Sequence, residues 1–289
     1  MMNVSFFHGE SVDSNRIVYT PSAFAKTNLI HLQEIGTLKA KKPHINNRKG
    51  LVSFLFFVVV SGSGNLMYDG EKYHIREGDC IFIDCRKSYY HESSEDLWTL
   101  KWIHFYGFNM SGIYDKYMER CGMPYFRPNS IKNYCDTIDE LFNIASSDDY
   151  IRDMKIFERL SKILTLVMED SWQPHKNRKY SKKKQNLSEV KSYLDEHFVE
   201  KISLDYLSEV FYINKFYLTR VFKEQFGISI NNYILQKRIT KAKQMLRFTD
   251  KTAEEIGLEC GLGAAYYFSR MFKSYEGISP GEYRKNWLG

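Results

Sequence analysis

Two segments of fourteen residues carry basic and hydroxyl side chains at the same spacing. Residues 216–229 read FYLTRVFKEQFGIS and residues 266–279 read YYFSRMFKSYEGIS, and half of their positions are identical. Arg220 and Lys223 are three positions apart and therefore share one face of a helix. A guanidinium pairs with phosphate or with the O6 and N7 atoms of guanine, and an ammonium binds phosphate as a point charge. The repeated segment therefore has the chemistry of a helix that binds nucleic acid.

A short apolar helix and a tight turn must position each of these helices. SLDYLSEV and FYIN precede KFYLTRVFKEQF, and TAEEIGLE and CGLG precede AAYYFSRMFKSY. This is the layout of a helix-turn-helix, whose second helix enters the major groove of DNA. We expect such units at about 203–226 and 252–275. Their outward residues, which we expect to contact DNA, are Lys215, Phe216, Thr219, Arg220 and Lys223 in the first and Ala265, Tyr266, Ser269, Arg270 and Lys273 in the second.

Helix-end signals surround both units. Thr252 and Glu255 have the spacing of a capping box, and Gly227 and Gly277 follow the second helices as C-terminal glycines do. Residues 231–248 predict one long helix that would hold the units at a fixed separation. A plain helical-hairpin repeat with solvated basic residues is the alternative, but solenoids need about three copies or more.

Residues 186–287 resemble the DNA-binding domain of the AraC/XylS family of bacterial transcription regulators. The stretch IGLECGLGAAYYFSRMFKSYEGISPGEYR carries the resemblance. Gly257 and Leu262 stand where the family usually has Ala and Phe, and a helical glycine costs about 1 kcal/mol. We call the second helix of each helix-turn-helix unit its reading helix. Because the second reading helix begins with Ala264 and Ala265, we expect the first reading helix to carry more sequence specificity. The resemblance implies base and backbone contacts from Phe216, Thr219 and Arg220, and from Ala265, Tyr266, Ser269 and Arg270.

The first part of the chain has a β pattern from about 28 to 108. Asp69 and Gly70, between two alternating runs, predict a two-residue hairpin. The apolar run at 51–60 predicts a buried strand, being about half the length of a membrane-spanning helix. Short strands separated by turns are typical of a small barrel or jelly roll. The expected fold is α+β with more than one domain: a β-barrel or jelly roll with helices, then an all-α domain of two helix-turn-helix units.

The stretch SGSGNLMYDGEKYHIREGDCIFIDCRKSYYHE, followed by WTLKWIHFYG, resembles the cupin-like sensor domain of many members of this family. The resemblance implies a small-molecule effector. Aromatic walls with a few polar groups suit a sugar or a related carbohydrate. Arg48 and Trp102 match ligand-contacting positions of sugar-sensing relatives. A core role is the alternative for each ring, above all for Trp98 and His104. The candidate effector-binding residues are Arg48, Tyr89, His91, Trp98, Trp102 and His104.

No arrangement of residues suggests catalysis. The histidines are scattered, without the His-x-His pair through which enzymatic cupins bind metal. No nucleophile elbow, P-loop or paired acidic motif occurs in a plausible context. We therefore expect no catalytic residue, no metal and no cofactor. An enzyme that uses the cupin pocket and a purely structural helical adaptor are the rival classes.

A helical stripe and a basic segment separate the two halves. The stripe fits either a helix packed on its own domain or a coiled-coil-like dimer seam, and consists of Phe157, Leu160, Leu164 and Val167. Residues 171–185 contain six basic residues and no acidic one, which is typical of a linker. We expect a cupin-like sensing and dimerisation domain at 1–170, a basic linker at 171–185 and a DNA-binding domain at 186–289.

The basic excess lies in the second half of the chain. Residues 1–170 hold 20 basic and 22 acidic residues, whereas residues 186–289 hold 15 and 13, and the net charge is +6. This asymmetry favours a polyanionic partner. The five cysteines have no zinc-site spacing, and no secretion signal is visible. We therefore expect a reduced, cytoplasmic setting without a membrane partner.

The combined prediction is a sequence-specific bacterial transcription regulator that responds to a small-molecule effector. We expect it to be a homodimer whose partners are double-stranded promoter DNA and RNA polymerase. A DNA-binding regulator without an effector, controlled by a partner protein or by its own abundance, is the alternative. Both activation and repression are compatible with the sequence.

Overall fold

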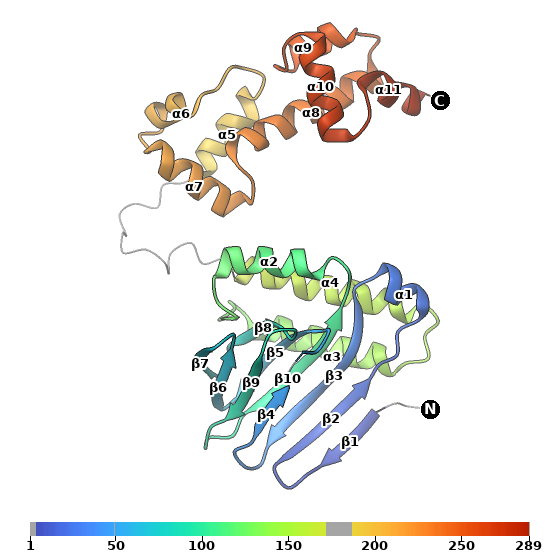
Figure 1. Ribbon diagram of the computed structural model, residues 1–289, viewed down its shortest axis with the longest axis vertical. Helices are drawn as coiled ribbons and strands as arrows, with labels where there is room; N and C mark the ends of the chain where they lie inside the picture. Colours follow the sequence, from blue (N-terminus) through green and yellow to red (C-terminus); the bar gives the residue numbers. More distant parts are fainter. Residues whose placement is uncertain (1–3, 49, 172–186, 289) are drawn as a thin grey trace. The chain divides into compact units, whose positions relative to one another are not determined.

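The computed structural model describes residues 4–48, 50–171 and 187–288. The chain divides into two compact units, residues 1–173 and residues 174–289. The first unit is rich in β-sheet, and the described part of the second is helical (Figure 1). The predicted α+β fold class, with an all-α second part, is therefore confirmed. Apart from Ser171, the predicted linker at 171–185 lies outside the described residues.

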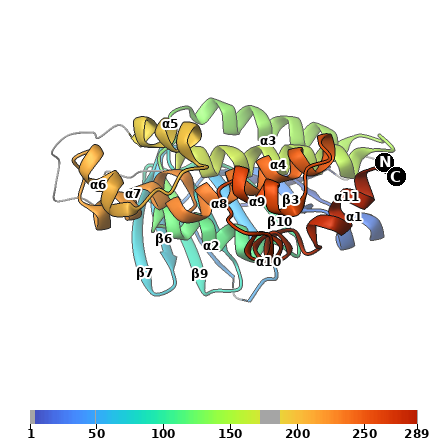
Figure 2. The same ribbon diagram turned by 90° about the horizontal axis from the view of Figure 1, so that it is seen from above.

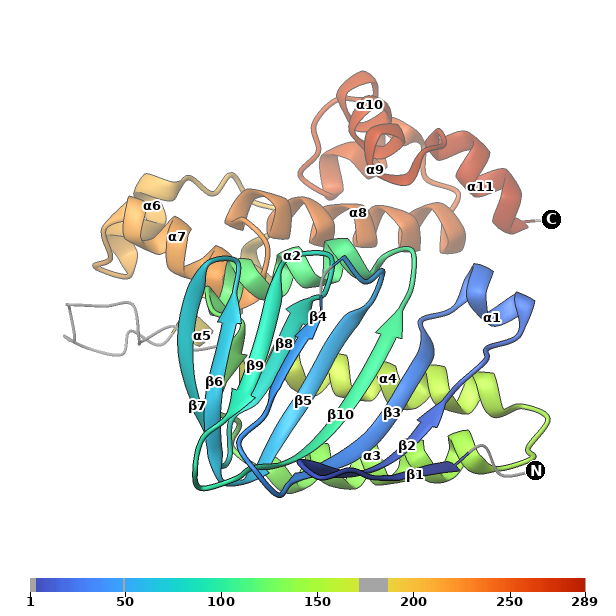
Figure 3. The ribbon, with the colours of Figure 1, turned by 60° about the horizontal axis from the view of Figure 1, so that its bottom comes forward.

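The strands of the first unit form two antiparallel sheets that face each other (Figure 3). The larger sheet has the strand order β1-β2-β3-β10-β5-β8-β11, and the smaller has the order β4-β9-β6-β7. The strands are β1 (Val4–His8), β2 (Val12–Val18), β3 (His31–Ala40), β4 (Ile45–Arg48), β5 (Phe54–Ser61), β6 (Ser63–Tyr68), β7 (Glu71–Arg76), β8 (Cys80–Asp84), β9 (Tyr89–Ser93), β10 (Thr99–Tyr106) and β11 (Tyr125–Phe126).

Local sequence signals account for several of these strands. The hairpin at Asp69 and Gly70 is confirmed, since Tyr68 pairs with Glu71 and both turn residues have positive φ, 53° and 87°. The apolar run around β5 is a buried strand because both of its faces are covered. Phe54, Phe56 and Val58 face one core, whereas Leu55, Phe57 and Val59 face the space between the sheets.

The β region begins earlier than the predicted boundary near residue 28. β1, β2 and the short helix α1 (Ala23–Asn28) precede that boundary. The strand β2 has the sequence VDSNRIV, in which polar residues dominate and no apolar alternation marks a strand. Its pairing with β3 along its whole length is a long-range contact that local patterning does not reveal.

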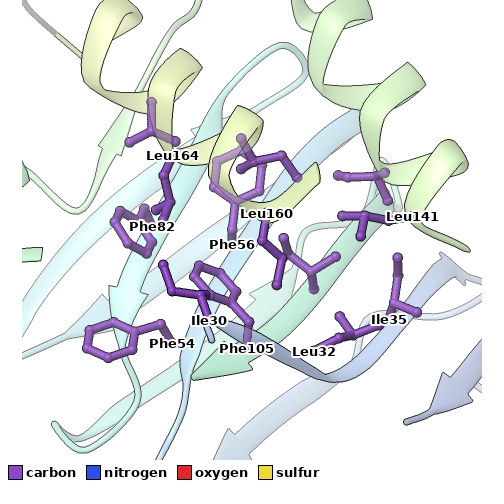
Figure 4. Close-up of a cluster of buried hydrophobic side chains, with 14 of the residues drawn as sticks. Ile30, Leu32, Ile35, Phe54, Phe56, Phe82, Phe105, Leu141, Leu160 and Leu164 are labelled. Carbon is purple, nitrogen blue, oxygen red and sulfur yellow. The ribbon is translucent and has the colours of Figure 1, made fainter. Parts of the chain in front are cut away.

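Helices cover the outer face of the larger sheet. α3 (Ile131–Ser146) and α4 (Arg152–Asp170) lie side by side in Figures 1 and 2, and α2 (Met110–Cys121) packs on the same core. Figure 4 shows Leu160 and Leu164 of α4 pointing toward Phe56 and Phe82 of the sheet. Of the two alternatives for the helical stripe, the structure therefore favours the helix packed on its own domain.

The buried Tyr19, which directly follows β2, forms a hydrogen bond with the start of α4. The hydroxyl of Tyr19 donates to the Asp153 carboxylate at 2.7 Å, and the Asp153 carboxylate also accepts from the backbone of Ser22. Burial and this hydrogen bond raise the pKa of Tyr19 to about 12. The tyrosine therefore stays a neutral donor, and it fixes α4 over the sheet.

The second unit contains α5 (Leu187–His197), α6 (Leu204–Val210), α7 (Lys215–Phe226), α8 (Ile230–Phe248), α9 (Ala253–Glu259), α10 (Ala265–Glu276) and α11 (Pro280–Leu288). The capping box at Thr252 and Glu255 is confirmed. Gly227 and Gly277 end α7 and α10 with φ of 74° and 83°, as predicted for C-terminal glycines. The long helix predicted at 231–248 is α8.

The internal repeat extends beyond the two helix-turn-helix units. Phe222 stacks edge-on against Tyr233 at 5.6 Å, and Phe272 makes the same contact with Tyr283 at 5.4 Å. The core residues Leu187, Val190 and Leu194 of α5 correspond to Ile239, Ala242 and Leu246 of α8. The first half of α8 therefore closes the first unit of the repeat, and the second half opens the next (Figure 1).

Leu160→Ala tests the packing of α4. It should lower the free energy of unfolding of the first unit by about 2–5 kcal/mol, because it opens a cavity above the sheet. Urea unfolding followed by tryptophan fluorescence measures this change. Lys162 lies on the same helix, 4.0 Å from Glu140 and half exposed, so Lys162→Ala should change stability by no more than about 0.5 kcal/mol. A loss of dimer with unchanged stability in Leu160→Ala would instead make the stripe a dimer seam.

Candidate nucleic-acid interface and ligand pocket

The second helices of the two units present matching faces. At each of the five outward positions, the residue of α7 and its counterpart fifty positions later in α10 have the same degree of burial. Phe216 and Tyr266 are exposed, at 75% and 81%. Arg220 and Arg270 are also exposed, as are Lys223 and Lys273, whereas the remaining two pairs are half buried. The inner faces are held by the buried Leu218 and Phe222, and by Phe268 and Phe272.

Several of the predicted DNA-contacting residues on α7 also contact residues of their own unit. The Lys215 ammonium lies 2.6 Å from the Asp205 carboxylate of α6. The Thr219 hydroxyl donates to the Lys215 carbonyl oxygen at 2.8 Å. The Arg220 guanidinium lies over the ring of Tyr217, 5.8 Å from its centre. Arg220 and Lys223 therefore supply most of the exposed positive charge on this face.

The helix starts differ between the copies. Asn214 caps α7, because its side-chain oxygen accepts from the backbone N–H groups of Phe216 and Tyr217. Ala264 occupies the same position before α10, where it has no side-chain oxygen to accept these bonds. The first reading helix thus has a better defined start than the second, in line with the greater specificity that we predict for it.

One arginine ties the two units of the repeat together. The Arg238 guanidinium, on α8, donates to the carbonyl oxygens of Phe198 and Glu200 at 2.6 and 2.7 Å, and these residues lie between α5 and α6. It also donates to the carbonyl oxygen of Gly261 at 2.7 Å, in the turn between α9 and α10. Burial lowers the pKa of Arg238. Two backbone segments, one from each helix-turn-helix unit, thus meet at one side chain.

A second arginine makes a similar set of bonds inside one unit. The Arg284 guanidinium on α11 donates to the carbonyl oxygens of Leu246, Thr249 and Lys251. These groups are the end of α8 and the loop that follows it. Arg284 therefore caps α8 and orients α11 within the second helix-turn-helix unit of the repeat. It does not reach the first helix-turn-helix unit.

The first unit holds a small, partly open cavity between its sheets. Its volume is about 40 Å³, and its wall combines residues from β2, β3, β5, β9 and β10. Across the larger sheet, Arg16, Gly36, Trp102 and Phe57 follow one another in register. A Cβ atom at Gly36 would lie 2.9 Å from the Trp102 ring, so the glycine lets this ring lie over β3. The wall residues are Ser14, Arg16, Leu38, Leu55, Phe57, Tyr89, His91, Leu100, Trp102 and His104.

The polar groups of this cavity are held in place by neighbouring residues. Arg16 forms an ion pair with Glu34 at 3.5 Å. The Nδ1 atom of His104 lies 2.9 Å from the Ser53 hydroxyl. An ion pair and ring nitrogens beside an indole can donate to and accept from hydroxyl groups while the indole covers an apolar face. The cavity therefore has the chemistry to bind a small polyhydroxylated molecule.

The structure brings together four of the six predicted effector-binding residues. Tyr89, His91, Trp102 and His104 all line the cavity. Trp98 is fully buried in the core between the sheets and is not part of the wall. The side chain of Arg48 lies outside the described residues, although its backbone pairs with Tyr89.

Sequence reasoning missed two polar wall residues, Ser14 and Arg16. Both lie on β2, which precedes the predicted β region. A strand with one polar face turned toward a cavity has no apolar alternation to reveal it. Arg16 supplies the cavity with the kind of charged group that the sequence analysis assigned to Arg48. Among the described residues, no group of three His, Cys, Asp or Glu side chains is arranged to hold a metal ion.

Two family models match the chain, one in each unit. Residues 43–167 match the AraC-like ligand binding domain, and residues 207–286 match a helix-turn-helix domain. The Msm operon regulatory protein of Streptococcus mutans is 21% identical over 240 residues, which are 81% of this chain and 84% of that protein. The transcriptional activator RhaS of an Enterobacter species is 31% identical over 99 residues. That match covers 34% of this chain and 36% of RhaS.

Solved structures give matches over one domain or over the whole chain. The C-terminal domain of the response regulator yesN from Fusobacterium nucleatum is 36% identical, with a TM-score of 0.33, covering 34% of this chain and 98% of that one. ToxT from Vibrio cholerae is 14% identical, with a TM-score of 0.33, covering 97% of this chain and 100% of that one.

A ligand-binding domain followed by a helix-turn-helix domain defines a DNA-binding transcription regulator with a site for a small molecule. The chain belongs to the AraC family of transcription regulators. The relatives named here are regulators of transcription. No helix among the described residues is both long and apolar enough to cross a membrane.

Arg238→Gln should make the spacing between two recognised DNA elements variable. The reason is that it removes hydrogen bonds between the two helix-turn-helix units. Selection from a random-sequence duplex pool with the wild-type chain should recover two elements at one separation. The variant should recover the same elements at several separations. Its free energy of unfolding should fall by about 1–3 kcal/mol, since three backbone carbonyl groups lose their donor.

Arg284→Gln is the matched control for this experiment. It also removes an arginine that serves three carbonyl groups, but all three lie near the junction of α8 and α9. It should therefore lower stability to a similar extent and keep the single separation. If Arg238→Gln also keeps one separation, the guanidinium does not set the distance between the reading helices.

Proposed function

We propose that the exposed faces of α7 and α10 bind promoter DNA, and that a small molecule between the sheets of the first unit controls this binding. The observation that carries the proposal is the repetition of one helix face, position by position, on two units joined by Arg238. Two such helices can enter successive major grooves about one helical turn apart.

The proposed contacts divide into base readers and phosphate binders. Arg220 is assigned to a guanine, because an exposed guanidinium on the outward face of a reading helix can bond both O6 and N7. Lys223 and Lys273 are assigned to phosphates, which carry no sequence information. Phe216, Tyr266 and the half-buried hydroxyls of Thr219 and Ser269 complete the two faces, together with Lys215, Ala265 and Arg270.

We assign the effector to the class of sugars and related carbohydrates. The support is chemical: the indole of Trp102 can stack on an apolar sugar face, and Arg16, His91 and His104 can bond hydroxyl groups. The cavity of about 40 Å³ has room for roughly three water molecules. A sugar therefore has to displace wall side chains, and Trp102 and Arg16 are half buried and closest to solvent. Binding would then shift the population toward one arrangement of the unit.

The same small volume favours a second candidate function. In that case Trp102 and the histidines are part of the core, and the regulator acts without a small-molecule effector. A partner protein or the abundance of the chain itself would then control transcription. In either case we propose a cytoplasmic homodimer that acts with RNA polymerase, as the family resemblance implies.

A thermal-shift screen of the full chain against sugars, polyols and organic acids separates these two functions. A ligand present at a hundred times its Kd should add about 2.7 kcal/mol to the stability of the folded state. Trp102→Ala should abolish the shift. Trp287→Ala, which removes an exposed indole in the second unit, should keep it. If the whole panel leaves the wild-type midpoint unchanged, the effector-free regulator is the better description.

Arg220→Ala tests the assignment of the first reading helix. It should weaken binding to a duplex selected by the wild-type chain by about 1–3 kcal/mol and relax the preference at one base pair. Lys223→Ala should instead weaken binding to all sequences alike and reduce the salt slope by about one. Competition binding at two salt concentrations measures both effects. An unchanged base preference in Arg220→Ala would remove α7 from the base-reading role.

A further inference from the structure

The side chain of Ser14 is buried in the wall of the cavity between the sheets. Ser14 lies in the middle of β2, is 5% exposed and lines the cavity. Among the residues that the structure describes, none is a hydrogen-bond partner of its Oγ atom. A buried hydroxyl without a partner destabilises the folded state, and native proteins usually provide such a group with a protein atom or a water molecule.

Strand pairing places this hydroxyl among apolar neighbours. Ser14 pairs with Leu38 of β3, and Leu38 pairs with Leu100 of β10. Paired residues of neighbouring strands share a face of the sheet, so the three side chains point to the same side. Both leucines also line the cavity. The sheet therefore offers the Ser14 hydroxyl no donor or acceptor, and an apolar residue at this position would simply continue the row.

Two other buried serines of the first unit have partners for their hydroxyl groups. The Ser53 hydroxyl donates to the Phe54 carbonyl oxygen at 3.2 Å and lies 2.9 Å from Nδ1 of His104. The Ser93 hydroxyl accepts from the backbone N–H of His44 at 3.2 Å. These hydroxyls have a role inside the fold. Ser14 shows no such role, and its hydroxyl group faces the cavity instead.

The position of Ser14 relative to Trp102 suits contact with a molecule in the cavity. A Cβ atom at Gly36 would lie 2.9 Å from the Trp102 ring and 3.1 Å from Cβ of Arg16, so the indole extends across β3 toward β2. Ser14 and Arg16 lie on the same face of β2, about 7 Å apart along the strand. A ring that stacks on the indole therefore has one edge beside these two side chains.

We infer that Ser14 determines the specificity of the effector site, because its hydroxyl forms a hydrogen bond with a hydroxyl group of the bound molecule. This inference rests on the proposed effector role of the cavity. A serine hydroxyl both donates and accepts, as does the hydroxyl of a sugar. A ligand that lacks this hydroxyl would displace water from Ser14 and leave its Oγ atom unpaired, which is a strong basis for discrimination.

Ser14→Ala in the full chain without ligand tests whether the fold uses the hydroxyl. The midpoint of thermal unfolding of the first unit should stay unchanged or rise by up to about 4 °C, because no bond within the fold is lost. Ser53→Ala is the matched control and should lower the midpoint by about 2–8 °C, since its hydroxyl has partners. An equal fall in Ser14→Ala would make the hydroxyl structural and overturn the inference.

Affinities for sugars test the contact itself. The probes are aldohexoses and aldopentoses, each with its monodeoxy analogues. For a sugar that binds the wild-type chain, one monodeoxy analogue should bind about tenfold to a hundredfold more weakly. Ser14→Ala should bind the sugar and that analogue alike. Titration calorimetry gives the four affinities of this double-mutant cycle. Thr37→Ala removes a hydroxyl from the opposite face of β3 and should keep the wild-type preference.

The possible results separate this inference from the proposed function. If a sugar binds the wild-type chain and Ser14→Ala binds it equally well, the effector role stands and the role of Ser14 is rejected. The role of Ser14 is also rejected if Ser14→Ala weakens the sugar and all its analogues by the same factor, because the serine would then only shape the cavity. If no probe binds the wild-type chain, the carbohydrate effector and the inference about Ser14 are rejected together.

Discussion

The geometry of the second unit depends on one half-buried guanidinium, that of Arg238. The two four-helix bundles share α8, and an isolated helix can bend. Arg238 and the close approach of Gly261 to Val199 add contacts between the bundles. The planar guanidinium has donors pointing in several fixed directions, so it can bond three carbonyl groups from two segments at once. Two of these acceptors belong to the loop after α5 and one belongs to the α9–α10 turn. The interaction converts a repeat of similar bundles into one body with two reading helices, which is what recognition of two DNA elements at a fixed distance requires.

The two copies of the helix-turn-helix share α8 because each copy packs against a helix before it and a helix after it. A helix-turn-helix cannot bury its apolar surface alone, so each copy recruits a helix before it and a helix after it. Tyr233 closes the first bundle and Tyr283 closes the second in the same way. In the first bundle, the Asp195 carboxylate joins α5 to α8. Burial alone would raise the pKa of Asp195, but hydrogen bonds from Lys191, Lys237 and Tyr233 lower this pKa well below its usual range. Each bundle is thus stabilised by packing, and exposed faces remain available for DNA.

Local signals allowed much of this architecture to be predicted, and long-range pairing accounts for what was missed. The helix-turn-helix units, the caps and the Asp69 hairpin depend on neighbours within a few positions, and all could be read from the sequence. Arg16 could not, because its strand is polar and its place in the cavity follows from pairing with β3. The correspondence between α5 and the second half of α8 was also hidden, since it is preserved in the pattern of buried residues and hardly in their identities.

The two copies differ at the turn between their helices. The α9–α10 turn has one residue more than the α6–α7 turn, since three residues separate Cys260 from Ala264 and two separate Phe211 from Asn214. A Cβ atom at Gly261 would lie 2.2 Å from the carbonyl oxygen of Val199, and one at Gly257 would lie 2.4 Å from the carbonyl oxygen of Gly263. Gly257 therefore lowers helix propensity by about 1 kcal/mol but permits this close approach. The α6–α7 turn carries Asn214 as a cap and the exposed Tyr212. The close approach of Val199 thus restricts the second turn to glycine at Gly261, whereas the first turn accommodates a large side chain at the corresponding position.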